Sequence, residues 1–143
     1  VGGEMRVAGN SPRGDAWRIA VERPEPGARA VALGIALEDI AVATSGDYRN
    51  YFELEGRRYS HSIDPRTGYP VAHDLVSVTV LADDCMTADG WATALTVLGA
   101  DEALALAEAE GLAVYLMRRD GERIVPLYSS AFAPWLEQST PTQ

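Results

Sequence analysis

Large apolar residues occupy every second position in two early segments of the chain, residues 16–23 and Val31 to Leu37. A period of two is typical of a strand that buries one face. The alanines and leucines of the second segment also suit a helix, but its large side chains fit the period of two better. We therefore predict two half-buried strands, followed by a turn at Glu38-Asp39 and a further strand at residues 40–42.

Two residue pairs that end in glycine predict further reversals of the chain. Glu55-Gly56 and Asp120-Gly121 place glycine where a hairpin needs a positive φ angle, which glycine adopts at little cost. Strand-like sequence occurs again from Val76 to Ala82 (VSVTVLA) and in residues 112–118. Together these segments predict a largely antiparallel sheet.

Helical sequence is confined to the second half of the chain. Met86 to Leu98 and Asp101 to Glu110 are rich in alanine and leucine and are separated by a glycine. Asp83 or Asp84 is expected to cap the first helix, and Asp101 the second. Because strands precede and follow this helix pair, the predicted fold class is α+β, a largely antiparallel sheet with a packed helix pair.

Composition narrows the classes of function. The 143 residues are 47% hydrophobic and 23% charged, as expected for one soluble globular unit. Twelve basic and 21 acidic side chains give a net charge of -9, which argues against binding to nucleic acid. The single cysteine, Cys85, has no identifiable base beside it and is given no catalytic role. No apolar run approaches the roughly 20 residues of a membrane span.

Asp89 and Thr93 form the clearest candidate metal site in the sequence. They lie four residues apart on a predicted helix, so a carboxylate and a hydroxyl project from the same face. Mg²⁺ prefers such oxygen ligands. The alternative is a solvated Asp near a helix start with a packed or back-bonded Thr, and spacing alone favours that alternative.

His61 is the candidate group for proton transfer. It lies in YSHSIDPRTGYP, a Pro/Gly-rich turn at residues 59–70 that would expose backbone N–H groups to a ligand. A lone histidine is more often structural than catalytic, so both roles remain open. His73 is interpreted as a surface or turn residue. The run from Ala43 to Tyr48 is rich in small residues and could allow close approach of a ring or phosphate. The alternative is an ordinary exit from a strand.

Three motifs in the order TSGDY, HSIDPRTG and ADGWAT resemble those of the ApbE-like FAD:protein FMN transferases. VGGEMRVAG at the start resembles a strand of that family, and YSSAFAPWL resembles its closing segment. The resemblance covers essentially the whole chain. It implies an ApbE-like, T-fold-like C-terminal half, with residues 1–143 forming the C-terminal portion of a flavin transferase domain.

The resemblance also implies a reaction and a set of roles. FAD is split at its pyrophosphate, FMN is joined through its phosphate to a Ser or Thr hydroxyl of a target flavoprotein, and AMP leaves. Mg²⁺ is required, and by analogy Asp89 and Thr93 bind it. Ile63 lies against FAD, and His61 is the candidate base for the acceptor hydroxyl.

The chain departs from the family pattern in two respects. The family's N-terminal half, which carries further FAD contacts and one more metal ligand, is missing from these residues. Activity is therefore expected to need that half or a companion chain. Position 92 is Ala where some members carry an additional Asp, so this helix lacks a third side-chain ligand.

Two other functions remain alternatives. One is an FAD pyrophosphatase that releases FMN and AMP by using water in place of the protein hydroxyl. The other is an FAD-binding maturation protein without turnover. By resemblance, the protein is expected in the periplasm or anchored to the membrane on its extracytoplasmic side.

Overall fold

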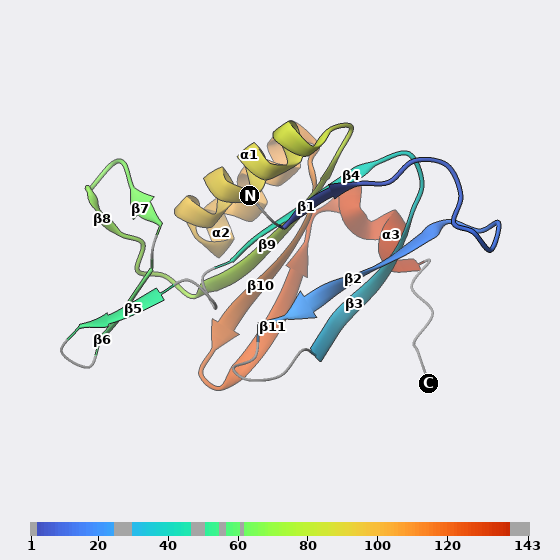
Figure 1. Cartoon of the computed structure of the whole chain (residues 1–143). Coiled ribbons are helices and arrows are strands. Elements are labelled where there is room, and N and C mark those ends of the chain that lie inside the picture. Colours follow the sequence, from blue (N-terminus) through green and yellow to red (C-terminus); the bar gives the residue numbers. More distant parts are fainter. Residues whose placement is uncertain (1–2, 25–29, 47–50, 55–56, 61, 138–143) are drawn as a thin grey trace.

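The computed structural model describes residues 3–24, 30–46, 51–54, 57–60 and 62–137, with the backbone alone at 51–54, 57–60 and 137. Its centre is a five-stranded sheet in which every neighbouring pair is antiparallel (Figure 1). In spatial order the strands are β1 (Glu4–Arg6), β4 (Ala41–Gly46), β9 (Leu75–Ala82), β10 (Ala113–Asp120) and β11 (Arg123–Tyr128). The prediction of a largely antiparallel sheet is confirmed.

Among the described residues, three two-stranded antiparallel pairs accompany this sheet. They are β2 (Trp17–Arg23) with β3 (Ala30–Leu37), β5 (Tyr51–Leu54) with β6 (Arg57–Ser60), and β7 (Ile63–Asp64) with β8 (Tyr69–Pro70). The last two pairs extend together from one end of the sheet, at the left of Figure 1.

The two predicted helices are present and adjoin each other. They are α1 (Cys85–Leu98) and α2 (Ala100–Glu110). Asp84 caps α1, as expected, by accepting a hydrogen bond from the backbone N–H of Thr87. The prediction that Asp101 caps α2 is wrong, because the connection is so short that Gly99 is itself the N-cap. Asp101 instead lies in the first turn, where a carboxylate also interacts favourably with the helix dipole.

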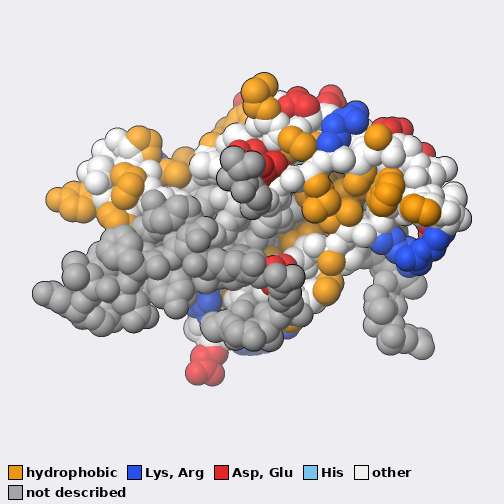
Figure 2. Space-filling view, viewed as in Figure 1, with side chains coloured by type: hydrophobic (Ala, Val, Ile, Leu, Met, Phe, Trp, Pro, Cys, Tyr) orange, Lys and Arg blue, Asp and Glu red, His pale blue; other side chains and the backbone are white. Residues whose placement is uncertain are grey.

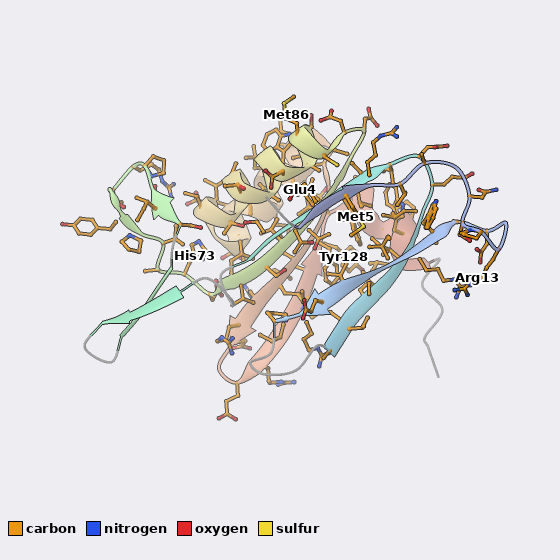
Figure 3. The ribbon with its side chains drawn as sticks, in the orientation of Figure 1. Glu4, Met5, Arg13, His73, Met86 and Tyr128 are labelled. Carbon is orange, nitrogen blue, oxygen red and sulfur yellow. The ribbon has the colours of Figure 1, made fainter. Side chains whose placement is uncertain are left out.

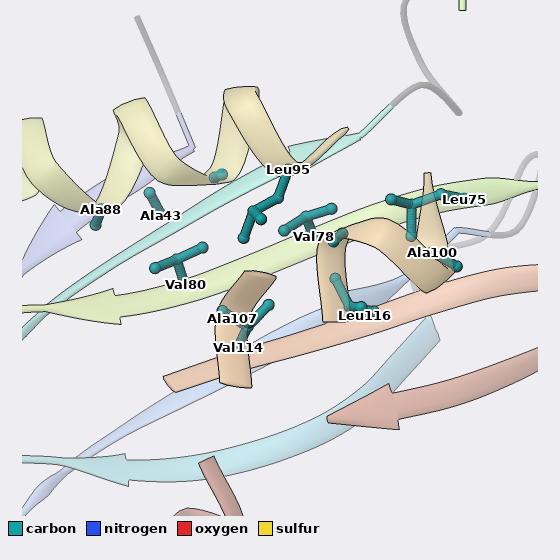
Figure 4. Packing of buried hydrophobic residues seen from close by; sticks show 12 residues of the cluster. Ala43, Leu75, Val78, Val80, Ala88, Leu95, Ala100, Ala107, Val114 and Leu116 are labelled. Atoms are coloured by element: carbon teal, nitrogen blue, oxygen red, sulfur yellow. The ribbon is translucent and has the colours of Figure 1, made fainter. Parts of the chain in front are cut away.

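Both faces of the main sheet are covered, by different elements. The two helices pack on one face, where the buried residues include Val78, Val80, Leu95, Val114 and Leu116 (Figure 4). The β2–β3 pair covers the other face together with a short turn η1 (Ser130–Phe132) and α3 (Ala133–Glu137). The sheet is thus the middle layer between two apolar cores.

The predicted reversals have different outcomes. The hairpin at Asp120-Gly121 is confirmed between β10 and β11, with Gly121 at φ 62°. Glu55-Gly56 lies outside the described residues. The turn at Glu38-Asp39 exists, and Asp39 has φ 50°, but β4 does not pair with β3. Instead the chain crosses there to the main sheet. Among the described helices, none has the length and apolar character needed to cross a membrane.

Candidate functional site

Asp89 and Thr93 lie on the exposed side of α1, as the helical spacing predicted. Ala88 and Ala92, one residue earlier in each case, are fully buried against the sheet. Since successive residues on a helix point about 100° apart, the carboxylate and the hydroxyl lie together beside the packed face. The sheet therefore fixes the helix while both oxygen-bearing groups remain accessible.

The structure decides one half of the alternative interpretation, because Thr93 is exposed and so is not packed, whereas an exposed Asp89 fits a solvated carboxylate as well as a metal ligand. Within the described residues, neither the Asp89 carboxylate nor the Thr93 hydroxyl has a hydrogen-bond partner. Thr96 is the back-bonded threonine of this helix, since its hydroxyl donates to the Ala92 carbonyl oxygen at 2.8 Å. Asp89 lies beyond the first turn of α1, which contains no acidic residue, so interaction with the helix dipole does not explain an aspartate at this position.

These two groups suit a hard cation but supply only part of its shell. Carboxylate and hydroxyl oxygens are appropriate for Mg²⁺, which usually keeps several waters and binds substrate phosphates as well. Among the described residues, no group of three or more His, Cys, Asp or Glu side chains gathers around them. Ala92 faces the core, so even an aspartate there would point away from the other two groups.

Residues 62–73, here called the arch, lead away from the sheet and return to it. The backbone N–H of Val71 donates to the Ser62 carbonyl oxygen at 3.0 Å and closes the base of the arch. At the tip, Thr67 and Gly68 donate backbone hydrogen bonds to the Asp64 carbonyl oxygen. Gly68 has φ 72°, which a glycine adopts without strain.

Asp64 and Arg66 form the polar centre of the arch. The Arg66 guanidinium donates to both carboxylate oxygens of Asp64, with its Nη2 at 2.8 Å and its Nε at 3.0 and 3.1 Å. The Arg66 backbone N–H adds a bond of 2.9 Å. These bonds hold the pKa of Asp64 below its usual value, and His73 contributes in the same direction.

Ile63, the predicted flavin contact, lies on β7 at the start of the arch, and β7 lies against α1. Ile63 is 51% exposed, and Tyr69, further along the arch, is 74% exposed. Figure 2 shows hydrophobic side chains gathered on this part of the surface, at the left of the view. An exposed apolar surface of this kind suits a flat aromatic ligand. His61 lies outside the described residues, so its proposed role as a base stays a prediction.

Sequence reasoning missed the contacts that join the arch to the helices. Arg66 reaches Glu102 at the start of α2, with 3.3 Å between Nη1 and Oε2. His73, predicted only as a surface or turn residue, is exposed, yet its Nε2 lies 2.7 Å from the Thr96 carbonyl oxygen. Figure 3 shows His73 where the arch returns toward the sheet, beside the helix pair. The partners are 36 and 23 residues apart, and no local pattern links them.

Comparison with known proteins identifies the family. The ApbE family model matches residues 1–116. The FAD:protein FMN transferase of Haemophilus influenzae is 52% identical over 133 residues, which are 92% of this chain and 38% of that protein. The Vibrio cholerae protein of the same name is 48% identical, over 96% of this chain and 41% of that protein. The chain thus spans about two fifths of the length of these curated relatives.

Solved structures agree with the sequence comparison. The flavin transferase ApbE from Vibrio cholerae superposes with a TM-score of 0.83 at 46% identity, over 95% of this chain and 43% of that one. The apo form of the Pseudomonas stutzeri flavinyl transferase ApbE gives 0.81 at 44% identity, over 95% and 42%. The α+β fold inferred from the sequence is therefore shared with these enzymes, and the chain belongs to the ApbE family.

Proposed function

We propose that this chain forms part of an FAD:protein FMN transferase and supplies two metal ligands and a flavin contact. The observation that carries the proposal is the pair of oxygens of Asp89 and Thr93, which have no hydrogen-bond partner within the described part of the chain and lie on the helix that contacts the strand of Ile63, β7. The names of the relatives support the same activity.

In the proposed reaction a Ser or Thr hydroxyl oxygen of an acceptor flavoprotein attacks the phosphorus on the FMN side of the FAD pyrophosphate. One P–O bond forms, the bond to the bridging oxygen breaks, and AMP leaves with that oxygen. The hydroxyl proton passes to a base, for which His61 is the candidate. A bound Mg²⁺ would neutralise charge on the two phosphates.

Asp89 and Thr93 would hold that ion, and Ile63 would lie against the flavin. Two side-chain ligands are too few for an octahedral ion, so the proposal includes further oxygens from substrate phosphates, water and other residues. An N-terminal half like that of the relatives, or a companion chain, would complete the FAD pocket. Export to the extracytoplasmic side is also proposed, and cell fractionation would test it.

The decisive experiment incubates the full-length gene product with FAD, Mg²⁺ and a flavoprotein domain that carries the target Ser or Thr. Transfer predicts one AMP released for each covalently bound FMN, seen as in-gel flavin fluorescence and an FMN-sized mass increase. Free FMN and AMP with an unmodified acceptor would instead indicate the pyrophosphatase. FAD binding without AMP release at saturating Mg²⁺ would indicate the maturation protein.

A further inference from the structure

The arch is attached to the helix pair at two places. We infer that Arg66, Glu102 and His73 are positioning residues, which fix Ile63 relative to Asp89 and Thr93 and thereby set where the flavin lies. The inference rests on the proposed function, since it assigns these residues to the same site. None of the three needs to touch the reacting atoms.

The first step is that the arch is internally rigid. The forked Asp64–Arg66 contact and the two backbone bonds to the Asp64 carbonyl oxygen hold residues 64–68 in one conformation. The Thr67 hydroxyl also accepts from the backbone N–H of Tyr69 at 3.2 Å. Because Ile63 directly precedes this turn, it moves only when the arch moves as a unit.

The second step is that both attachments lie at the junction of α1 and α2. Arg66 contacts Glu102, in the first turn of α2, while His73 contacts Thr96, in the last turn of α1. A carbonyl oxygen only accepts, so Nε2 of His73 must carry the proton in this bond. The ring also fits closely against Gly99, where an added Cβ would lie 3.2 Å from its Cδ2.

The third step links the attachment to the site. Thr93 and Thr96 are one turn apart on the same helix, so the carbonyl group that binds His73 belongs to the element that presents the metal ligands. Phosphoryl transfer depends on the relative placement of flavin phosphate and cation, and a shift of about 1 Å can cost on the order of 100-fold in rate. Loosening either attachment should therefore impair use of FAD.

The chain offers matched variants. Asp101 and Glu102 are neighbours in the first turn of α2, and each pairs with one arginine, at 3.4 and 3.3 Å. Only the partner of Glu102 belongs to the arch, since Asp101 pairs with Arg118 of β10. Asp101→Asn is therefore the control for Glu102→Gln. His73→Gln keeps a donor near the Nε2 position, whereas His73→Ala removes it.

Transfer would be measured in the full-length gene product with varied FAD, and separately with varied Mg²⁺ at saturating FAD. We expect His73→Ala to lower kcat/KM for FAD about tenfold and His73→Gln to recover most of it. Glu102→Gln should lower kcat/KM for FAD only about threefold, because an exposed ion pair is weak. Asp101→Asn should keep this value within about twofold of the wild type. The Mg²⁺ concentration for half-maximal rate should not change.

The inference would be overturned if the losses followed the melting temperature and were equal in the control Asp101→Asn. Unchanged kinetics in both His73→Ala and Glu102→Gln would also overturn it. If His73→Ala does not fold, Glu102→Gln compared with its control Asp101→Asn still decides. An active wild type with unaffected variants rejects this inference alone. A wild type without transfer rejects the proposed function, and the inference falls with it.

Discussion

The carboxylate of Asp84 accepts two hydrogen bonds from one residue, Thr87: the backbone N–H at 2.8 Å and the hydroxyl at 2.9 Å. These bonds hold the pKa of Asp84 below its usual value and fix the first turn of α1. The helix that presents Asp89 and Thr93 therefore has a defined start.

Replacing this cap should destabilise the protein without changing its chemistry. Asp84→Ala removes both acceptors and leaves the Thr87 N–H without its partner, so the melting temperature should fall by a few degrees. Asp84→Asn keeps an N-cap acceptor and should lose less. Thermal unfolding followed by circular dichroism measures both, and an unchanged melting temperature in Asp84→Ala would contradict the capping role.

Removing a proposed metal ligand should slow turnover severely but leave the fold intact. Asp89→Ala changes an exposed side chain, so the free energy of unfolding should change by no more than about 0.5 kcal/mol. Charge stabilisation by a metal is worth several kcal/mol, which predicts a rate loss on the order of 100-fold. Thr93→Val should give a smaller loss.

Glu110→Ala is the control for that experiment, because it removes one exposed carboxylate at the far end of α2. Its Mg²⁺-dependent rate should match that of the wild type. Wild-type rates in Asp89→Ala would exclude this residue as a ligand.

The ion pair within the arch predicts how stability depends on pH. The pKa of Asp64 is lowered in the folded protein, mainly by the Arg66 guanidinium, from an ordinary value of 3.8. Its stabilising contribution is therefore fully present above pH 3.8 and is lost as the pH falls through the lower folded-state value. Asp64→Asn lacks this contribution at every pH.

Urea unfolding of the wild type and Asp64→Asn would test this expectation. The wild type should be the more stable at neutral pH, and the difference should shrink as the solution is made more acidic than the ordinary pKa of the carboxyl. A difference that persists unchanged into strong acid would assign the effect to packing rather than to charge.

A side chain at position 99 should destabilise the protein. The backbone of Gly99 lies at φ 85° and ψ 168°, and an added Cβ would press on the ring of His73. Gly99→Ala should therefore cost about 1–3 kcal/mol from backbone strain, together with a further loss from the displaced ring. Gly111→Ala is the comparison, because its φ is 65° but nothing lies within 4 Å of the added Cβ.

The Gly111 variant should cost only about 1 kcal/mol. Combining Gly99→Ala with His73→Ala should cost less than the sum of the two single changes, since the second change removes the clash. Chemical denaturation of all four variants measures these differences, and strict additivity would show that ring and glycine do not interact.

Much of this fold could be predicted from local pattern. The period of two in residues 16–23 marks β2, and the alanine-rich run that ends in Leu98 marks α1. The position of β4 could not be predicted from sequence, because its partners β1 and β9 are distant in the chain and no local signal says which sheet a strand joins. The supposed cap at Asp101 failed because the helix connection is a single residue.

The candidate site also has one part that could be predicted from sequence and one that could not. Asp89 and Thr93 could be paired from sequence because helical geometry fixes the relation of residues four apart. The Arg66–Glu102 and His73–Thr96 contacts could not, because tertiary packing alone brings those residues together. Local spacing predicts which residues share a helix face, whereas only the structure shows how the arch packs against the helices.

Five buried alanines line the surfaces that α1 and α2 press against the sheet: Ala88, Ala92, Ala100, Ala103 and Ala107. A methyl group is the smallest side chain that can separate a helix from a sheet, and the spacing of packed elements depends on the size of such groups. These methyl groups set the distance between the sheet and the helix that carries the two proposed ligands. A bulkier residue at position 88 or 92 would move the helix away from the sheet. The size of the core side chains therefore determines how far from the sheet a cation could be bound.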